Sequence, residues 1–217
     1  MMSDLIYLSE LESHFHEASR VDIVCVGDSI TGWNNIRSNE VRVQSGPFPT
    51  YPQFLQELMP ELCVADCGVA GAFSKEGYDH TTICLGLFQN ANYYIIGYGA
   101  NDMAGVGNIP DIHERSQKII SNLEKIINKV LKKQKKPILL NVPKINGNRF
   151  PIATRLKANL ERLDYNECLR DYCNQRQIPL VDIYSRLNDG HFADGIHPNE
   201  EGAGIIAQEV YRIFQLI

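Results

Sequence analysis

The sequence predicts an α/β fold in which helices cover both faces of a five-stranded parallel sheet. Short apolar segments rich in Val, Ile, Leu and Tyr alternate along the chain with longer segments of helical spacing, and each apolar segment is nearly continuous. Parallel strands need crossover connections, and strands that are covered on both faces are apolar throughout. We therefore expect a flavodoxin-like sheet, although the alternation alone does not fix the order of its strands.

Five segments have the length and composition of buried strands. They are residues 21–27, 62–66, 93–98, 137–142 and 178–183. Apolar residues at helical spacing predict helices in the segments between them. The clearest is expected at residues 111–134, and the others at 51–59, about 81–89, 155–176 and 200–216, after a leading helix at about 4–17.

Ligands of open α/β sheets bind beyond the carboxyl ends of the strands. Two long irregular stretches, residues 31–50 and 141–154, follow the first and fourth strands at that edge. We therefore expect the functional residues to lie there.

The composition is that of an ordinary globular chain. With 217 residues, 44% of them hydrophobic and 22% charged, the chain is long enough to bury one core, and we expect a single domain over residues 1–217. Its formal net charge of −5 gives no electrostatic reason to expect nucleic acid as a partner. No apolar run has the length of a membrane span. The pattern gives no indication of the oligomeric state.

The cysteines do not form the pattern of a disulfide framework, because most of them fall in predicted strands or a predicted helix. The absence of a CxxC pair also argues against a zinc site. The first residues lack the basic and apolar segments of a signal peptide. We therefore expect reduced thiols and a cytoplasmic location.

Two short segments, far apart in the chain, carry residues suited to acyl-ester hydrolysis. Ser29 follows the first strand by way of Gly27 and Asp28, and Asp194 and His197 lie three residues apart just before the last helix. A serine hydroxyl becomes a good nucleophile when a base accepts its proton, and that base needs an orienting partner. We expect Ser29, His197 and Asp194 to form a catalytic set. The alternative interpretations are an N-capping serine and a surface turn capped by aspartate.

Donors for an oxyanion are expected at the ends of the second and third strands. Gly68 follows the second strand, and Asn101 lies in the segment Gly99-Ala100-Asn101-Asp102 after the third. A developing alkoxide needs fixed N–H groups, so we expect the backbone of Ser29 and Gly68 and the side-chain amide of Asn101 to supply them. The alternatives are a simple turn glycine and a turn-forming asparagine. Asp102 is expected to hold its loop through local hydrogen bonds.

Four motifs together resemble the sequence blocks of the SGNH (GDSL-type) hydrolases. They are Gly27-Asp28-Ser29-Ile30, Gly68, Gly99-Ala100-Asn101-Asp102 and Asp194-Gly195-Ile196-His197-Pro198. The resemblance spans nearly the whole chain beyond about residue 20. It implies a three-layer α/β/α fold, a Ser–His–Asp triad of Ser29, His197 and Asp194, and an oxyanion hole formed by Ser29, Gly68 and Asn101.

One position departs from the family pattern. Asp66 stands where the family often has asparagine, two residues before the glycine of the second block, and this residue usually supports the loop. The Ile30-Thr31 pair is more similar to small acetylesterases and platelet-activating-factor-acetylhydrolase-like members than to lysophospholipases and thioesterases.

No cofactor and no metal are expected. His191, Asp194 and His197 recur every three residues, but a glycine and a proline among them make a continuous helix unfavourable. The dinucleotide-like run at residues 202–207 lies within the last predicted helix and has no strand before it. The GxSxG elbow of the α/β-hydrolases is absent.

The sequence thus predicts a serine esterase. Its expected partner is a small-molecule ester substrate with a small acyl group, and acetyl is the expected one. Three alternatives stay open. They are a lysophospholipase-like or thioesterase-like hydrolase of longer acyl chains, an acyltransferase that uses the same triad, and a non-hydrolytic ligand-binding relative.

Overall fold

A five-stranded parallel sheet forms the centre of the molecule. The computed structural model describes residues 20–37, 40–42, 44–104, 111–146 and 151–217, so the helix expected at about 4–17 lies outside the described residues. The strands are β1 (Val21–Gly27), β4 (Cys63–Gly68), β5 (Tyr93–Gly97), β6 (Lys136–Leu140) and β7 (Leu180–Val181). Their order is β4-β1-β5-β6-β7. This is the flavodoxin-like order, and the predicted fold class is confirmed.

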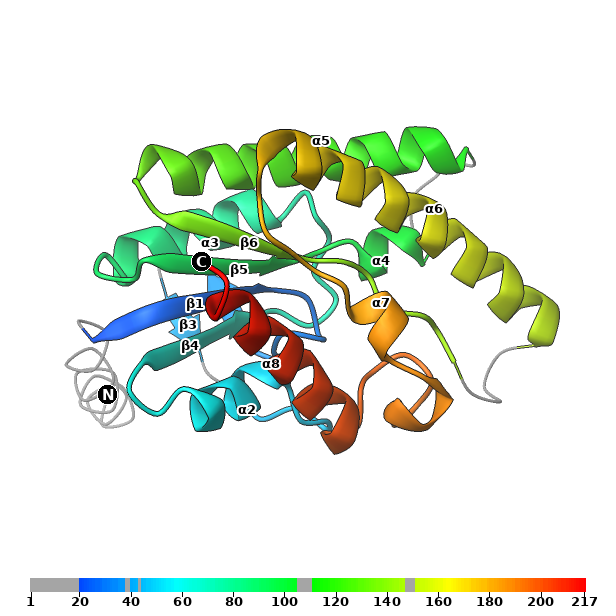
Figure 1. Ribbon diagram of the computed structural model, residues 1–217, viewed down its shortest axis with the longest axis horizontal. Coiled ribbons are helices and arrows are strands. Elements are labelled where there is room, and N and C mark those ends of the chain that lie inside the picture. Colours follow the sequence, from blue (N-terminus) through cyan, green and yellow to red (C-terminus); the bar gives the residue numbers. More distant parts are fainter. Residues whose placement is uncertain (1–19, 38–39, 43, 105–110, 147–150) are drawn as a thin grey trace, which may run out of the picture.

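Helices cover both faces of the sheet, as the continuous apolar strands predict (Figure 1). One layer consists of α3 (Gly77–Leu87), α5 (Ile112–Lys132) and α6 (Ile152–Arg176), and the other of α2 (Tyr51–Leu58) and α8 (Glu200–Phe214). Successive side chains of a strand point to opposite faces. In β1, Val24 and Val26 accordingly pack in the core under α5, whereas Ile23 and Cys25 pack in the core under α8.

Among the described helices, none combines the length and the apolar character that a membrane span requires.

The structure also contains short elements that the sequence did not predict. The stretch expected to be irregular at 31–50 contains a two-stranded antiparallel ribbon, β2 (Asn35–Arg37) and β3 (Glu40–Arg42). The helical turns α4 (Ala100–Met103) and α7 (Ile183–Arg186) follow β5 and β7. The 3₁₀ turn η1 (Asp189–His191) comes after α7.

Three glycines lie side by side where the three adjacent strands β4, β1 and β5 end. Gly27 pairs with Gly68 on one side and with Gly97 on the other. A Cβ on Gly27 would overlap the hydroxyl of Thr31, and one on Gly68 would overlap the backbone of Gly32. The loop after β1 therefore folds back across the strand ends at a distance that only glycine permits.

Candidate active site

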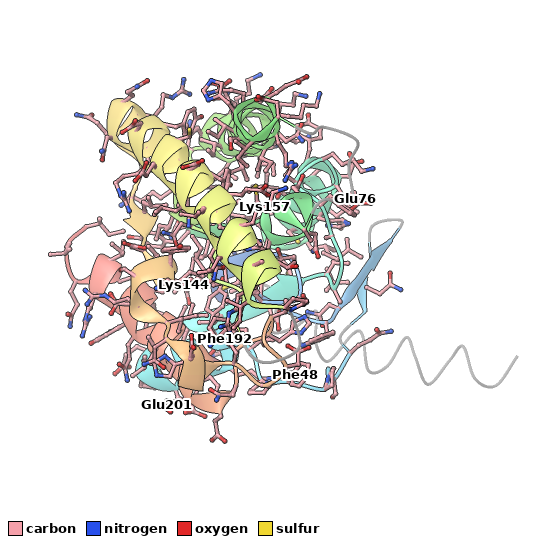
Figure 2. All side chains as sticks on the ribbon, turned by 90° about the vertical axis from the view of Figure 1, so that its right-hand side faces the viewer. Phe48, Glu76, Lys144, Lys157, Phe192 and Glu201 are labelled. Atoms are coloured by element: carbon pink, nitrogen blue, oxygen red, sulfur yellow. The ribbon has the colours of Figure 1, made fainter. Side chains whose placement is uncertain are left out.

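The predicted site residues meet at the carboxyl end of the sheet, on the right in Figure 1. Ser29 comes from the loop after β1, Asn101 from α4, and His197 from the loop before α8. All three line one cavity of about 440 Å³. Figure 2 faces this end of the molecule, with Lys157 of α6 above the middle of the view and Phe48 below it.

The hydroxyl, the imidazole and the carboxylate of the predicted triad are joined by hydrogen bonds. Ser29 Oγ lies 3.0 Å from Nε2 of His197, and Nδ1 of the same ring lies 3.0 Å from Oδ2 of Asp194. The structure therefore brings together all three side chains, although 168 positions separate the serine from the histidine. The carboxylate is acceptor-only, so it favours the tautomer that leaves Nε2 free to accept the serine proton.

The Asp194 carboxylate is fixed by its own loop. Its Oδ1 accepts the backbone N–H of Ile196 at 3.0 Å and that of His197 at 2.8 Å. Partial burial by itself raises the pKa of Asp194, but the hydrogen bonds from His197 and Ile196 outweigh it and hold that pKa below its ordinary value. The group is thus ionised at neutral pH, as an orienting partner of an imidazole must be.

The loop that carries His197 is tied to its surroundings on both sides. Gly195 has a φ of +89°, which turns the chain between Asp194 and His197. Its carbonyl accepts the backbone N–H of Asn146 at 2.6 Å. Phe192 and Pro198 form an isolated antiparallel bridge across the loop. The imidazole is therefore held in place before any ligand arrives.

Two aromatic rings lie against the imidazole. The Phe48 ring stacks on His197 with centroids 5.2 Å apart, and the Trp33 ring lies 5.1 Å from the same imidazole. Gly46 packs so closely on the Trp33 ring that a Cβ there would overlap it. These contacts could not be predicted, because nothing in a loop sequence shows which side chains a distant histidine will contact.

The Asn101 amide has a hydrogen available for a ligand. Its Nδ2 donates one hydrogen bond, to the carbonyl oxygen of Ala72 at 2.9 Å, and an amide nitrogen carries two hydrogens. The backbone N–H of Ser29 likewise has no acceptor within the part of the chain that is described. Both groups border the cavity that contains the serine hydroxyl.

The third predicted donor, the backbone N–H of Gly68, is not available. It donates to Oδ1 of Asp66 at 2.9 Å, so it is directed into the protein instead of the cavity. Gly71, three residues later, is exposed and has a φ of +77°. Its N–H has no acceptor among the described residues, and the neighbouring Ala72 is the residue that Asn101 binds. In the sequence, Gly71 could have been noticed as the second glycine of the segment Gly68-Val69-Ala70-Gly71.

Asp66 holds three loop segments together beneath the site. Its Oδ1 accepts hydrogen bonds from Nδ2 of Asn34 and from the N–H of Gly68, and its Oδ2 accepts one from Oγ1 of Thr50. Burial raises the pKa of this carboxyl to about 7, although the same hydrogen bonds act in the opposite direction. The loop support that the family resemblance implies for this position is thus made by a carboxyl group.

Asp102 joins two distant segments, and the expected local hydrogen bonds are not its main contacts. Its carboxylate accepts from the backbone N–H of Ser74 at 2.9 Å and from the hydroxyl of Ser74 at 2.7 Å. Nδ2 of Asn122 donates to the same hydroxyl at 3.0 Å, which links α4 and α5 to the segment after Gly71.

The described residues of this region do not form a metal site. Within the ranges that the structure covers, no group of three or more His, Cys, Asp or Glu side chains is placed to hold a metal ion. His191 does not join His197, because its Nδ1 accepts the backbone N–H of Asn188 at 3.1 Å and its Nε2 faces Glu201 at 3.6 Å.

A flavodoxin-like fold with a hydrogen-bonded Ser–His–Asp array at the carboxyl edge of its sheet has the arrangement of a serine-dependent acyl hydrolase. Residues 25–205 match the sequence profile of the GDSL-like Lipase/Acylhydrolase family, and the chain belongs to that family. It is 25% identical over 140 residues to the GDSL esterase/lipase WDL1 of Oryza sativa subsp. japonica. That match covers 56% of this chain and 52% of the rice protein, so the chain spans about half the length of this curated relative.

Solved structures share the fold at low sequence identity. Est24, a carbohydrate acetylesterase from Sinorhizobium meliloti, superposes with a TM-score of 0.71 at 13% identity, over 91% of this chain and 100% of its own. Axe2, an acetylxylan esterase from Geobacillus stearothermophilus, superposes with a TM-score of 0.64 at 19% identity, over 89% and 95%. At these identities the likeness establishes the fold alone.

Replacing Asp66 by asparagine should raise stability most at high pH. Because the folded-state pKa is about 7 and the ordinary value 3.8, the native protein retains a proton that the unfolded chain loses, and stability falls as pH rises between these values. Asp66→Asn keeps an acceptor for the two N–H donors and removes this loss. Each pKa unit corresponds to about 1.4 kcal/mol, so we expect the free energy of unfolding to gain roughly a few kcal/mol above pH 7 and almost nothing near pH 4.

The measurement is the free energy of unfolding of both proteins by urea from pH 4 to pH 8. Asp164→Asn, at an exposed position of α6, serves as the control. A difference between Asp66→Asn and the parent protein that is constant with pH would contradict the buried-carboxyl explanation.

Proposed function

We propose that this protein is a serine esterase that hydrolyses small O-acyl esters, with acetyl as the preferred acyl group. The observation that carries the proposal is the array Ser29 Oγ, His197 and Asp194, linked by two contacts of 3.0 Å and open to a cavity of about 440 Å³. Membership of the GDSL-like Lipase/Acylhydrolase family supports ester hydrolysis. Two structures of the same fold are described as acetylesterases, which is consistent with a small acyl group.

In the proposed mechanism, His197 transfers the proton twice. Nε2 takes the proton of Ser29 as Oγ attacks the ester carbonyl carbon, and gives it to the oxygen of the departing alcohol. An acyl-enzyme remains. A water molecule then attacks the same carbon, again with Nε2 as the base, and Ser29 recovers the proton when the acid leaves. Asp194 keeps the ring oriented and stabilises the imidazolium in both halves of the reaction.

The negative charge on the carbonyl oxygen needs N–H donors that are already in place. We assign this role to the backbone N–H groups of Ser29 and Gly71 and to the second hydrogen of the Asn101 amide. The bond from Asn101 to the Ala72 carbonyl supports this assignment, because it fixes the asparagine amide beside the turn that presents Gly71. Gly68, which the sequence predicted as a donor, instead supports the loop through Asp66.

The charged side of the cavity favours a short acyl chain. Helices α5 and α6 contribute charged side chains to it. They are Arg115, Lys157, Glu161 and Arg162. A longer chain gains about 0.8 kcal/mol for each methylene only where apolar surface receives it. The α5 and α6 side of the cavity offers little such surface, whereas the rest is lined by apolar residues that include Ile30, Met103, Ile145 and Ile196. The acyl-length series therefore decides between the short-chain and the longer-chain hydrolase.

Removing either end of the proton path should abolish turnover. Ser29→Ala and His197→Ala are each expected to lower kcat for 4-nitrophenyl acetate by about 10⁴- to 10⁶-fold, and the double variant should be little worse, because residues that act as a unit are not additive. Asp194→Asn should lose less. The control variants are Ser121→Ala and His113→Ala, both exposed on α5. EDTA should not change the rate, since no proposed step uses a metal. Single losses that multiply in the double variant would refute a shared mechanism.

Asn101→Ala should act on the transition state. Since the amide is aimed at charge that is absent from the ground state, we expect kcat to fall by about 10²- to 10³-fold with little change in KM. Steady-state kinetics on 4-nitrophenyl acetate separate the two constants. The melting temperature of the variant reports whether loss of the bond to Ala72 disturbs the fold. A normal kcat with a raised KM would show that Asn101 binds the ground-state ester.

Acyl length should limit the rate above four carbons. We expect kcat/KM to peak between acetyl and butyryl in a series of 4-nitrophenyl esters that extends to palmitoyl, because a chain that reaches the charged α5 and α6 side of the cavity gains little apolar contact there. Carboxylate release is measured alongside nitrophenol release, so that transfer of the acyl group to an added alcohol is detected as well. An optimum at octanoyl or beyond would exclude the small-ester proposal and favour the longer-chain hydrolase.

A further inference from the structure

The cavity beside Ser29 has an excess of positive charge, although the chain as a whole carries a formal net charge of −5. Three cationic side chains line it, Arg115, Lys157 and Arg162, and one carboxylate, that of Glu161. Figure 2 shows Lys157 on α6 at this end of the molecule. An acidic protein with a cationic reaction cavity has an electrostatic preference that its overall charge does not reveal.

The single carboxylate is already shared by two of the cations. Glu161 Oε2 lies 3.3 Å from Nη1 of Arg115, and its Oε1 lies 3.8 Å from Nζ of Lys157. Each oxygen of Glu161 thus faces a different cation, and Arg162 is left without a carboxylate partner from this group.

Arg162 is buried and has almost no polar partner. Its residue is 4% exposed, its Nε is buried without a hydrogen bond, and its Nη1 makes a long bond of 3.4 Å to the carbonyl of Ala158 on the same helix. It forms no ion pair with any residue that the structure describes.

The guanidinium is charged under ordinary conditions. Burial lowers the pKa of Arg162 to about 10, which still leaves it protonated at neutral pH. Among the acidic groups, Glu161 acts on this pKa most strongly, but its two carboxylate oxygens already face Arg115 and Lys157. Asp28 acts less strongly, and burial raises the pKa of Asp28 to about 7, so that carboxyl carries only part of a negative charge. Leaving a buried cation without a partner costs free energy, and a ligand oxyanion that binds it recovers that cost.

We propose that Arg162 binds an anionic group of the substrate, a carboxylate or a phosphate, while the ester carbonyl of the same molecule lies at Ser29. This inference rests on the proposed esterase function and names its substrate class: an acyl ester that carries a negative charge. Arg162 and Ser29 line the same cavity, whose volume of about 440 Å³ holds both groups of a small molecule. The planar guanidinium suits either oxyanion, since it can donate two parallel hydrogen bonds. Arg115 and Lys157 add attraction for the approaching anion.

The test compares charged and neutral esters on the intact protein. The probes are 4-acetoxybenzoate and 4-acetoxyphenyl phosphate, with the charge in the alcohol part, and mono-4-nitrophenyl succinate, with the charge in the acyl part. The neutral partners are the methyl esters of the two carboxylates and phenyl acetate for the phosphate. We expect the wild-type protein to prefer at least one anionic probe over its partner by about tenfold or more in kcat/KM. Which probe is preferred distinguishes carboxylate from phosphate.

Arg162→Gln should lower that ratio by about 10- to 100-fold, the usual value of a hydrogen bond to a charged group, and Arg162→Lys should recover part of it. The matched control is Arg170→Gln, which removes an arginine of the same helix that pairs with Asp182 outside the cavity. A purely structural role of Arg162 would lower the rates for both members of a pair equally. That result, or a wild-type protein without preference for any anionic probe, would overturn the proposal.

Binding is measured separately from hydrolysis by calorimetry of Ser29→Ala with the same probes. Absence of turnover on every ester refutes the proposed function, whereas tighter binding of an anionic probe than of its neutral partner still supports the assignment of Arg162. Equal binding of both refutes that assignment even where esters are hydrolysed. If Arg162→Gln fails to fold, the wild-type ratio and the Arg162→Lys variant decide the question.

Discussion

The close approach of backbone to backbone at the ends of three neighbouring strands is the constraint on which the site depends. Gly27, Gly68 and Gly97 lie in register, and the loop after β1 crosses over them within a distance that a Cβ would forbid. Thr31 and Gly32 occupy the space that side chains would take. The loop is thus packed against the strand ends, and the Asp66 carboxyl group of β4 accepts a hydrogen bond from its Asn34 side chain. The nucleophile is positioned by backbone packing, a stiffer support than a flexible side chain supplies.

Much of the fold could be predicted because its signals are local. Strand β1 has the predicted bounds, since a continuous apolar run can be buried only between two layers of helices. Strand β7 is much shorter than the predicted 178–183, because Asn141 accepts the backbone N–H groups of Ile183 and Tyr184 and turns the chain into α7. Helix α3 begins four residues before the predicted start. Glycine is a poor helix former, so Gly77 does not signal the start of a helix in the sequence. In the structure it is the first residue of α3, and its missing side chain lets Tyr98 and Ile126 pack against the helix.

The site, like the fold, could be predicted where its contacts are local in the sequence and could not where they depend on tertiary packing. Asp194 and His197 lie in one loop, so their contact is a short-range property of the sequence, and the strand order brings Ser29 to them. The direction of the Gly68 N–H could not be predicted in this way. It depends on a tertiary contact, because Asp66 accepts this N–H within the protein. The residues that α6 contributes to the cavity could not be predicted either, because α6 lies beside the cavity only through tertiary packing.

The way α6 is attached to the rest of the molecule decides whether its charged residues can recognise a ligand in the cavity. Asn166 bonds both the N–H and the carbonyl of Val142, at 2.9 and 2.8 Å, and Asn159 bonds both groups of Ile145, at 2.8 and 2.9 Å. Two side-chain amides thus fix the helix to the loop that follows β6, as an additional strand would. Arg162 lies between these two attachments in sequence, so the hydrogen bonds of Asn159 and Asn166 fix the backbone that carries its side chain. A charge held in this way needs no reorganisation when its partner arrives, and its desolvation cost is met during folding and not during binding.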